Sequence, residues 1–408
     1  MLRVDPAEIQ AVADQRLAEV LAAARTVEPY RTLWAGLDQP RTREDMAELP
    51  ITERHHLQAP SLEARLTVPR NQVSARSTAG TTGVPVVVAR TNDQNRFVDV
   101  LTWRQFRAQG VPIEARRLNL DLDRRRQHAA LEVDGQVIEM SLPESPAKVA
   151  EIIRAHDVEV LVACPSVLID VADALGPTQM KGIVTFGEVR TPADVAALED
   201  AYGVRPMDFY GASEVHVVSW ECPSGSGYHV DADAILLEVV DEDGRTAAPR
   251  EPGWVVVTAL WNTAAPIVRY RVEDIATLNP DPCPCGITLP LMGMVEGRTL
   301  DWIIAPDGRR VSPFRLVPVT LLGDGWTPHV RRSRVIQRAV DDFLIEVEWR
   351  SDRREDLVAR MAPAIEWVLG SPVRVECRDV TEIRVGPSEK FRQVVSLVTR
   401  PEAEIPAG

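Results

Sequence analysis

Hydrophobic runs and helical periodicities alternate along residues 145–215. Runs that predict strands occur at Val158–Ala163, Gly182–Phe186 and Val204–Tyr210. The segments between them, Ser166–Leu175 and Pro192–Tyr202, place apolar residues at the spacing of an amphipathic helix. Strands that alternate with helices of about ten residues predict βαβ units and a parallel sheet.

The pattern changes after Tyr228, where strand runs follow one another without helices between them. These runs are Ala234–Val240, Gly253–Leu260 and Pro266–Tyr270, and Asp243-Gly244 between the first two is a turn signal. This stretch therefore predicts a β-rich subdomain that follows the α/β region.

A different alternation begins near residue 300. The predicted elements are strands at Asp301–Ala305 and Phe343–Trp349, a helix over Asp356–Leu369, and strands at Val373–Arg378 and Val394–Val398. The chain is thus predicted to hold an N-terminal α/β domain, residues 1–300, and a small α+β domain, residues 301–408. The boundary is expected near Arg298–Asp301.

The N-terminal 70 residues predict mainly helix. Asp5 is a typical N-cap, and Pro6 suits the first helical position because its missing N–H has no partner there. The same segment carries several acidic residues and no continuous apolar run, which is unlike a signal peptide. No run of about 18 apolar residues occurs anywhere, so no membrane-spanning helix is expected.

Charge and cysteine content narrow the classes of function. The 408 residues include 60 acidic and 46 basic ones, giving a net charge of −14. This balance argues against nucleic acids and acidic membranes as main partners. Five cysteines in so long a chain do not suggest a disulfide framework, so a reducing cytoplasm is expected.

Lysine is rare in this chain. Only Lys148, Lys181 and Lys390 occur among the 46 basic residues, and all others are arginines. A lysine at a position where chemistry requires one is therefore informative. A cluster of arginines is not, and Arg124–Arg126 fits a solvated face as well as a binding site.

The first motif with chemical content is a loop of small and hydroxyl residues, Ser77 to Pro85, followed by the apolar run Val86–Val88. Small residues let a backbone approach phosphates closely, and hydroxyls and N–H groups then bind the anionic oxygens. The loop lacks the Gly-Lys-Ser/Thr ending of a Walker A motif. Taken alone, it is equally consistent with an ordinary surface loop.

Three further motifs follow in order. Asp208-Phe209-Tyr210-Gly211-Ala212-Ser213-Glu214 comes directly after a predicted parallel strand, where ligand crevices form. Ile267 to Asp274 places a carboxylate at a strand end, and Gly297 to Asp301 lies at the expected domain boundary. Each has a plain structural alternative: a strand-ending turn, a half-exposed strand and a linker turn.

The order of these motifs resembles that of the adenylate-forming enzymes, and within them the phenylacetate–coenzyme A ligase group. Three more segments agree with that group: Leu49-Pro50-Ile51-Thr52, Phe186-Gly187-Glu188 and Cys283-Pro284-Cys285-Gly286. The resemblance covers essentially the whole chain. It implies the fold of these enzymes, ATP, Mg²⁺ and coenzyme A as cofactors, and a homodimer as a candidate assembly.

The resemblance implies an ATP site made of residues from each motif. The residues around the β- and γ-phosphates would be Ser77, Thr78, Gly80, Thr81, Thr82 and Gly83. Gly187 and Glu188 would border the adenine, and Asp208 would lie near its amino group. Tyr210 would stack on the base, within a turn that also contains Gly211 and Ser213.

The resemblance also implies residues that bind charged groups and a residue about which the C-terminal domain moves. By the same resemblance, Glu214 would coordinate Mg²⁺ and Asp274 would bind the ribose hydroxyls. Arg298 would hold the ribose or phosphate side of the nucleotide, and Asp301 would be the hinge of the mobile C-terminal domain. Lys390 would be the adenylating lysine, because a compact mobile cation suits the pentavalent phosphate better than a planar guanidinium.

The implied reaction is ATP-dependent adenylation of a small aromatic carboxylic acid, followed by transfer to coenzyme A. Acyl-CoA, AMP and pyrophosphate would be the products. Two alternatives stay open. One is an adenylate-forming ligase with another acid or acceptor, either an amine that gives an amide or nitrite activated toward an aromatic amine. The other is a non-catalytic nucleotide-binding protein.

Departures from the group motivate these alternatives. Val84 stands where phosphate loops of the superfamily often carry a basic residue. Glu273 replaces the usual small residue before the ribose aspartate. Residues 119–128 do not resemble the glycine- and aromatic-rich segment that lines the acid pocket of phenylacetate enzymes.

A zinc site is expected in the β-rich segment. Cys222, His229, Cys283 and Cys285 offer three thiolates and an imidazole, the ligand set of a closed structural site. The spacing is not that of a zinc finger and alone is equally consistent with four unrelated residues. Related enzymes show a similar Cys…His…Cys-x-Cys arrangement, and this implies zinc here.

Overall fold

The computed structural model describes most of the chain. The described residues are 3–38, 40, 42–77, 86–121, 131–134, 136–141, 145–188, 190, 192–241, 243–293, 303–311, 316, 330–349, 357–383 and 392–398. The predicted site residues Thr78, Gly80, Thr81, Thr82, Gly83, Arg298, Asp301 and Lys390 lie outside them.

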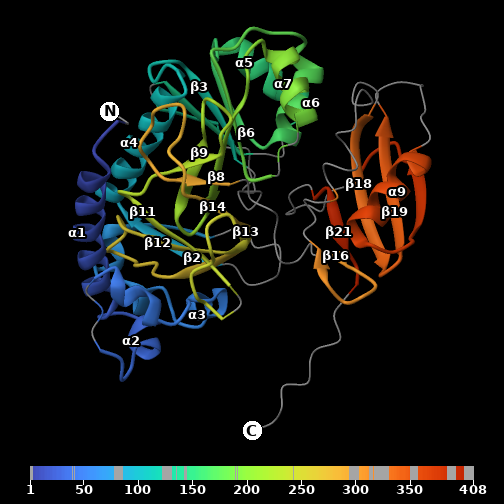
Figure 1. Cartoon of the computed structure of the whole chain (residues 1–408). Helices are drawn as coiled ribbons and strands as arrows, with labels where there is room; N and C mark the ends of the chain where they lie inside the picture. Colours follow the sequence, from blue (N-terminus) through green and yellow to red (C-terminus); the bar gives the residue numbers. More distant parts are fainter. Residues whose placement is uncertain are drawn as a thin grey trace. The chain divides into compact units, whose positions relative to one another are not determined.

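The chain divides into two compact units (Figure 1). The first comprises Met1–Gly187 and Leu198–Val295, and the second comprises Glu188–Ala197 and Glu296–Gly408.

The first unit is built on a mixed sheet with ten described strands, in the order β14-β15-β10-β9-β8-β7-β6-β3-β5-β4. Its five parallel strands are β3 (Arg117–Asp121), β5 (Val137–Ser141), β6 (Val160–Ala163), β7 (Gly182–Phe186) and β8 (Met207–Ala212). The strands that extend it by antiparallel pairing are β4 (Leu131–Asp134), β9 (His216–Glu221), β10 (Tyr228–Val230), β14 (Leu278–Asn279) and β15 (Leu291–Met292). The predicted α/β class is confirmed.

Helices α5 (Pro146–Ala155), α6 (Pro165–Leu175) and α7 (Pro192–Tyr202) connect the parallel strands and lie together (Figure 1). Apolar residues of these helices and of the sheet form one hydrophobic cluster. The Tyr202 hydroxyl donates to the Leu168 carbonyl, 2.7 Å away, and so ties α7 to α6. The predicted βαβ alternation is therefore confirmed, with helix and strand ends displaced by at most a few residues.

The N-terminal region is helical, as predicted, with α1 (Pro6–Ala24), α2 (Tyr30–Leu33) and α3 (Arg54–Gln58). The Asp5 carboxylate accepts from the Ala7 N–H at 2.9 Å, so the cap forms where the sequence places it. A hairpin of β1 (Val73–Ser77) and β2 (Val87–Thr91) follows, and then the long helix α4 (Asn92–Ala108).

The β-rich part of this unit is an antiparallel sheet of β11 (Ile235–Val240), β12 (Gly253–Ala259) and β13 (Tyr270–Ala276). The prediction of a strand at Pro266–Tyr270 is wrong, because the third strand begins at Tyr270. Arg269 just before it has φ +46°, a left-handed conformation that breaks an extended run and turns the residue inward.

The second unit has its own core. Its described strands are β16 (Ile303–Ile304), β17 (Arg310–Val311), β18 (Val330–Ala339), β19 (Asp342–Trp349), β20 (Arg374–Asp379) and β21 (Val394–Ser396). Four of them form a sheet in the order β20-β19-β18-β21, and α9 (Leu357–Leu369) packs on it (Figure 1). The predicted α+β pattern is present, and β18 is a strand that the sequence did not predict.

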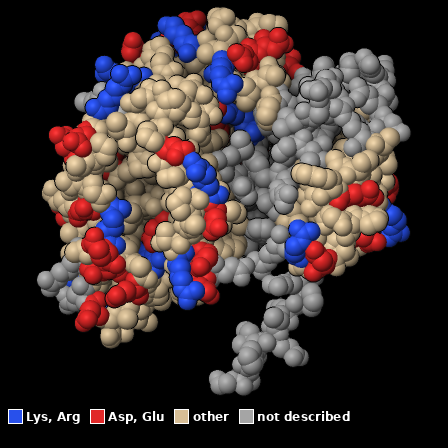
Figure 2. Space-filling model, viewed as in Figure 1, with Lys and Arg blue, Asp and Glu red and all other residues tan. Residues whose placement is uncertain are grey.

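Charges of both signs are interspersed over the face of the described residues that Figure 2 shows, without an extended basic area. Among the described helices, none combines the length and the apolar composition needed to cross a bilayer.

Arg269 is a buried arginine that joins the N-terminal region to the β-rich sheet. Its side chain is 3% exposed, and its guanidinium forms an ion pair with Glu238 on β11, with a shortest N–O distance of 3.0 Å. It also donates to the Ala47, Leu49 and Gly244 carbonyls. Burial of a charge is tolerated only when it is fully paired, as it is here.

The Arg269→Ala variant is expected to lower the free energy of unfolding by about 3 kcal/mol, because Glu238 and three carbonyls lose their donor. Arg245→Ala is the matched control, since Arg245 pairs with Asp243 on the surface with 76% of its side chain exposed. That control should lose less than about 1 kcal/mol. Urea unfolding followed by circular dichroism measures both, and equal losses would contradict the role assigned to Arg269.

Candidate active site and cysteine–histidine cluster

The candidate site lies around the turn between β8 and β9. Tyr210 and Gly211 lie near the end of β8, Ser213 and Glu214 form the turn, and β9 returns antiparallel from His216. A Cβ on Gly211 would collide with the backbone carbonyl of His216, so only glycine permits this close strand pairing. The Tyr-Gly sequence thus has a structural reason, and Ser213 in the turn is exposed.

Three buried carboxylates of this region are each held by a tyrosine hydroxyl. Tyr228 donates to Asp208 at 2.8 Å, Tyr210 donates to Asp274 at 2.9 Å, and Tyr270 donates to Glu214 at 3.0 Å. The three carboxylate residues are between 5% and 8% exposed. Phenol donors satisfy the charged oxygens and fix their orientation without supplying a counter-charge.

Asp208 is the most tightly held of the three. Besides the Tyr228 hydroxyl, its carboxylate accepts from the Thr185 hydroxyl on β7 at 2.5 Å. Its backbone N–H donates to Glu221 at 3.2 Å. Thr185 and Tyr228 were not predicted as site residues, since only the sheet order brings β7 and β10 to either side of β8 and β9.

Glu214 is joined to two other elements. Besides Tyr270 on β13, its carboxylate lies 3.5 Å from a guanidinium nitrogen of Arg54 on α3. Burial, and then the charge of Glu214, raise the pKa of the Tyr270 hydroxyl, so this group stays protonated and remains a donor. Arg54 was not predicted either; it follows the Leu49-Pro50-Ile51-Thr52 segment by two residues.

That segment is fastened to the start of β13. The Thr52 N–H donates to the Arg269 carbonyl at 2.8 Å, and the Arg271 N–H donates to the Thr52 carbonyl at 3.0 Å. The Thr52 hydroxyl donates to the Val268 carbonyl at 2.7 Å. Arg54 and Tyr270 therefore reach Glu214 from two chain segments that are hydrogen-bonded to each other.

The structure also describes the predicted residues Ser77, Gly187 and Glu188. Ser77 is the last residue of β1, and Gly187 follows β7 with φ +79°, a conformation that favours glycine. Glu188 follows it and is half-buried. Asp208, Tyr210, Glu214 and Asp274 are thus brought together by direct contacts with tyrosines and neighbouring strands.

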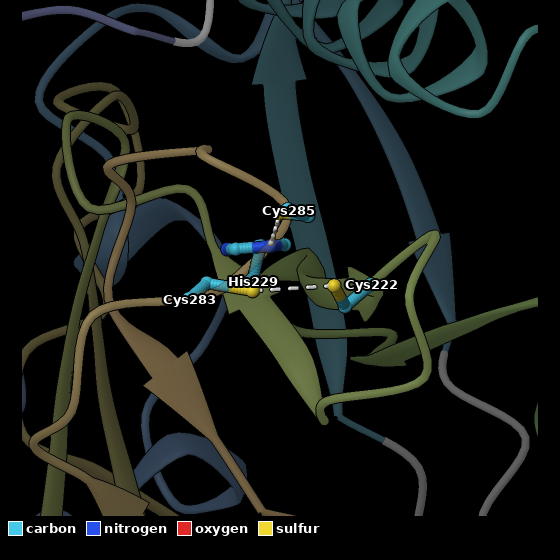
Figure 3. Close-up of side chains that lie close together, drawn as sticks. All are labelled: Cys222, His229, Cys283 and Cys285. Carbon is cyan, nitrogen blue, oxygen red and sulfur yellow. Dashed lines mark hydrogen bonds between the residues drawn. The ribbon is translucent and has the colours of Figure 1, made fainter.

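The second feature is the predicted cysteine–histidine cluster, which the structure assembles (Figure 3). The ligand atoms of Cys222, His229, Cys283 and Cys285 all lie within 4.8 Å of one another. Two sulfurs, those of Cys222 and Cys283, are 3.4 Å apart, and His229 Nε2 is 3.2 Å from the Cys285 sulfur. The four residues come from β10 and from two loops far apart in the sequence.

Neighbouring groups contact the imidazole and two of the three sulfurs. The Leu289 carbonyl lies 3.2 Å from His229 Nδ1; with the proton on Nδ1, Nε2 faces the cysteines with its lone pair. Backbone N–H groups of Ser224 and Ile287 donate to the sulfurs of Cys222 and Cys285, each at 3.4 Å. Burial opposes ionisation of Cys222, but hydrogen bonds led by Ser224 outweigh it and lower its pKa to about 6.

The amino-acid sequence is similar to those of known ligases. No family model matches the chain. A phenylacetate-coenzyme A ligase of Thermus thermophilus is 29% identical over 359 residues, covering 81% of this chain and 80% of the relative. A phenylacetate-coenzyme A ligase of Escherichia coli is 28% identical over 367 residues, covering 84% of this chain and 82% of the relative.

Solved structures show the fold. A 2-hydroxyisobutyryl-CoA ligase in its postadenylation state matches with a TM-score of 0.78 at 19% identity, covering 97% of this chain and 90% of its own. An anthranilate CoA ligase matches with a TM-score of 0.58 at 17% identity, covering 81% of this chain and 67% of its own. An amide bond synthetase from Marinactinospora thermotolerans matches with a TM-score of 0.54 at 17% identity, covering 81% and 70%.

The Tyr270→Phe variant is expected to lower the free energy of unfolding by about 2 kcal/mol, because Glu214 stays buried and loses a hydroxyl donor. Tyr202→Phe is the matched control. Its hydroxyl is also buried but donates to a neutral carbonyl, so about 1 kcal/mol should be lost. Urea unfolding of both variants tests the difference, and a larger loss for Tyr202→Phe would refute it.

Proposed function

Because this chain is an adenylate-forming enzyme of the acid–coenzyme A ligase type, similar to phenylacetate–coenzyme A ligases, we propose that it activates a small carboxylic acid with ATP. The acid and ATP first give an acyl-adenylate and pyrophosphate. Coenzyme A then takes the acyl group and releases AMP. An aromatic acid is the proposed substrate, because the curated relatives are named for one.

One observation supports this proposal most strongly. Tyr210 near the end of β8 donates to Asp274 of β13, and Tyr270 at the start of β13 donates to Glu214 in the turn after β8. The carboxyl end of a parallel strand is thus joined to a strand of the antiparallel sheet. The carboxyl end of an open parallel sheet is where nucleotides bind in α/β folds. A set of unrelated structural residues would have no reason to converge there.

The proposed roles follow the geometry of these groups. Tyr210 offers its ring to the adenine while its hydroxyl orients Asp274, which accepts from the ribose. Gly187 and Glu188, directly after β7, and Asp208 on β8 would border the base. In Asp208 each oxygen already accepts one hydroxyl, so a contact with the adenine amino group would use a remaining lone pair.

Mg²⁺ would be held by Glu214 and would neutralise the triphosphate during attack of the acid. The Glu214 carboxylate fits this use, because it is oriented by Tyr270 and offers oxygen ligands. Its partner Arg54 sits at 3.5 Å, a weak contact that leaves the carboxylate able to bind a cation. Ser77 and the loop from Thr78 to Gly83 are proposed to hold the phosphates.

Three proposed residues belong to the C-terminal part of the chain. Lys390 would stabilise the developing charge on the α-phosphate, and Arg298 would hold the nucleotide. Asp301 would be the hinge about which the C-terminal domain, residues 301–408, moves between the two half-reactions. The acceptor is coenzyme A in this proposal, with an amine acceptor as the alternative that the same assay separates.

The reaction is tested by ATP–pyrophosphate exchange across a panel of carboxylic acids and nitrite. Lys390→Ala is expected to abolish exchange while ATP binding, measured by calorimetry, is kept. Lys148→Ala is the matched control, since Lys148 is an exposed lysine on α5 paired with Glu151. Exchange retained by Lys390→Ala would remove that residue from the mechanism.

The acceptor is tested in the same reactions with coenzyme A or an amine added. Thioester formation detected by mass spectrometry is the expected result. Exchange without consumption of coenzyme A, together with amide formation, would show that the acceptor is an amine. ATP binding without exchange for any acid or nitrite would show a non-catalytic nucleotide-binding protein.

We also propose that Cys222, His229, Cys283 and Cys285 bind a structural Zn²⁺. Tetrahedral zinc with Zn–S bonds of about 2.3 Å separates two sulfurs by about 3.8 Å, which agrees with four ligand atoms inside 4.8 Å. The Leu289 carbonyl orients His229 for this role, and the backbone donors to two sulfurs stabilise thiolates. A full set of four protein ligands leaves no open position for a substrate, so the site is structural.

Purified protein is expected to contain about one zinc per chain by plasma mass spectrometry, since four ligands complete a tetrahedral site. Cys283→Ser should lose the metal and lower the thermal midpoint. Cys377→Ser is the matched control, because Cys377 lies on β20 in the second unit and is not one of the four residues of the cluster. A zinc content unchanged in Cys283→Ser would refute the assignment.

A further inference from the structure

Two arginines project from one face of the β1–β2 hairpin. The strands pair antiparallel with Arg76 opposite Val88, and Arg90 lies two residues further along β2. Cross-strand partners share a face and side chains alternate along a strand, so Arg76, Val88 and Arg90 point to the same side. Val88 packs in the hydrophobic cluster that Tyr210 and Ala212 border. The two guanidiniums therefore belong to the side of the hairpin that meets β8 and β9.

Neither of these two cations forms an ion pair among the described residues, and the Asp99 charge is the one carboxylate that acts on Arg90 there. The half-buried Arg90 guanidinium lies over the Trp261 ring, 5.1 Å from its centre. Burial, and then the charge of Arg76, lower the pKa of Arg90 to about 10. The Asp99 charge opposes this lowering without reversing it, and a bound anion would offset the remaining cost of burying the cation.

His216 adds an unused hydrogen-bonding group to the same place. It pairs with Ala212 at the start of β9 and has φ +67°. Its Nε2 atom is buried and has no hydrogen-bond partner in the part of the chain that the structure describes. Burial, followed by the charges of Arg90 and Arg76, lowers its pKa to about 3, so the imidazole is neutral and lies close to both cations.

We infer that Arg76, Arg90 and His216 form a second anion-binding position beside the turn that carries Glu214. The substrate would then be an acid with a second anionic group, such as a dicarboxylic acid. This inference rests on the proposed function. It names the substrate class of that site, and neither the relatives' names nor the motif roles assign these three residues.

We place the second anionic group of the substrate, and not the carboxylate that is adenylated, at the site formed by Arg76, Arg90 and His216. A carboxylate held by a guanidinium fork is largely neutralised and hydrogen-bonded on both oxygens, which makes it a poorer nucleophile toward phosphorus. The carboxylate to be adenylated must keep a free oxygen. Two guanidiniums and an imidazole also offer more donors than one reacting carboxylate uses.

The test compares acids that differ by one charge on the same skeleton: butyrate with succinate, and benzoate with isophthalate. In pyrophosphate exchange, the wild-type protein is expected to favour the dicarboxylate by about tenfold or more in kcat/KM. The reason is that the second carboxylate gains charge-assisted hydrogen bonds that the monocarboxylate cannot make. Arg90→Met keeps an apolar stem over Trp261 and removes the charge. It should erase this preference while changing the monocarboxylates by less than about twofold.

Two further variants serve as an independent test and as a control. Arg76→Met alters an exposed position and should reduce the same preference even if Arg90→Met folds poorly. Arg96→Met is the control, because Arg96 is an exposed arginine of α4 paired with Asp93. Calorimetric binding of the same acids, with a non-hydrolysable ATP analogue present, measures the preference without any turnover.

The outcomes separate this inference from the proposed function. Dicarboxylate binding that depends on Arg90 supports the inference even if no acid gives exchange, in which case the proposed function alone fails. Equal binding of both members of each pair overturns the inference while exchange still supports the function. Weaker binding of the ATP analogue by Arg90→Met, equal for every acid, also overturns it by assigning the cations to the triphosphate.

Discussion

The site depends on one constraint: a buried carboxylate must be hydrogen-bonded. Asp208 on β8, Glu214 in the turn after it and Asp274 on β13 are buried, and each accepts from a tyrosine hydroxyl of another element. A phenol donor leaves the negative charge of the carboxylate in place and fixes where it points, whereas a close cation would neutralise it. This is the property that the proposed nucleotide and Mg²⁺ contacts require.

The position of β13 is the second constraint on the site. Arg269 adopts a left-handed conformation and sends its guanidinium into the protein, where Glu238 and three carbonyls bind it. The residues on either side pair with Thr52, so the N-terminal segment is fastened to the strand that carries Tyr270 and Asp274. Arg269 thus lies directly before the strand that carries Asp274, and its packing helps to set the position of that strand.

The cysteine–histidine cluster and the arginines Arg76 and Arg90 differ in how their surroundings satisfy their polar atoms. In the cluster, a carbonyl and two backbone N–H groups contact the imidazole and two of the sulfurs, which supports the proposed cation. His216 Nε2 has no hydrogen-bond partner among the described residues, which supports the proposed anion. Composition alone would have concealed this second feature, because arginines are common throughout the chain.

The amino-acid sequence by itself determined the α/β alternation of residues 145–215, the capped first helix and the order of the motifs. Hydrophobic periodicity and capping are local properties, so a single segment shows them. It also indicated Asp208, Tyr210, Glu214 and Asp274, through motifs next to predicted strands. Only the tertiary structure decided that Tyr228, Tyr270 and Arg54 hold these groups. It also shifted the predicted strand at Pro266–Tyr270 and revealed β18. These depend on contacts between residues far apart in the chain, and no local pattern records which distant donor satisfies a buried charge.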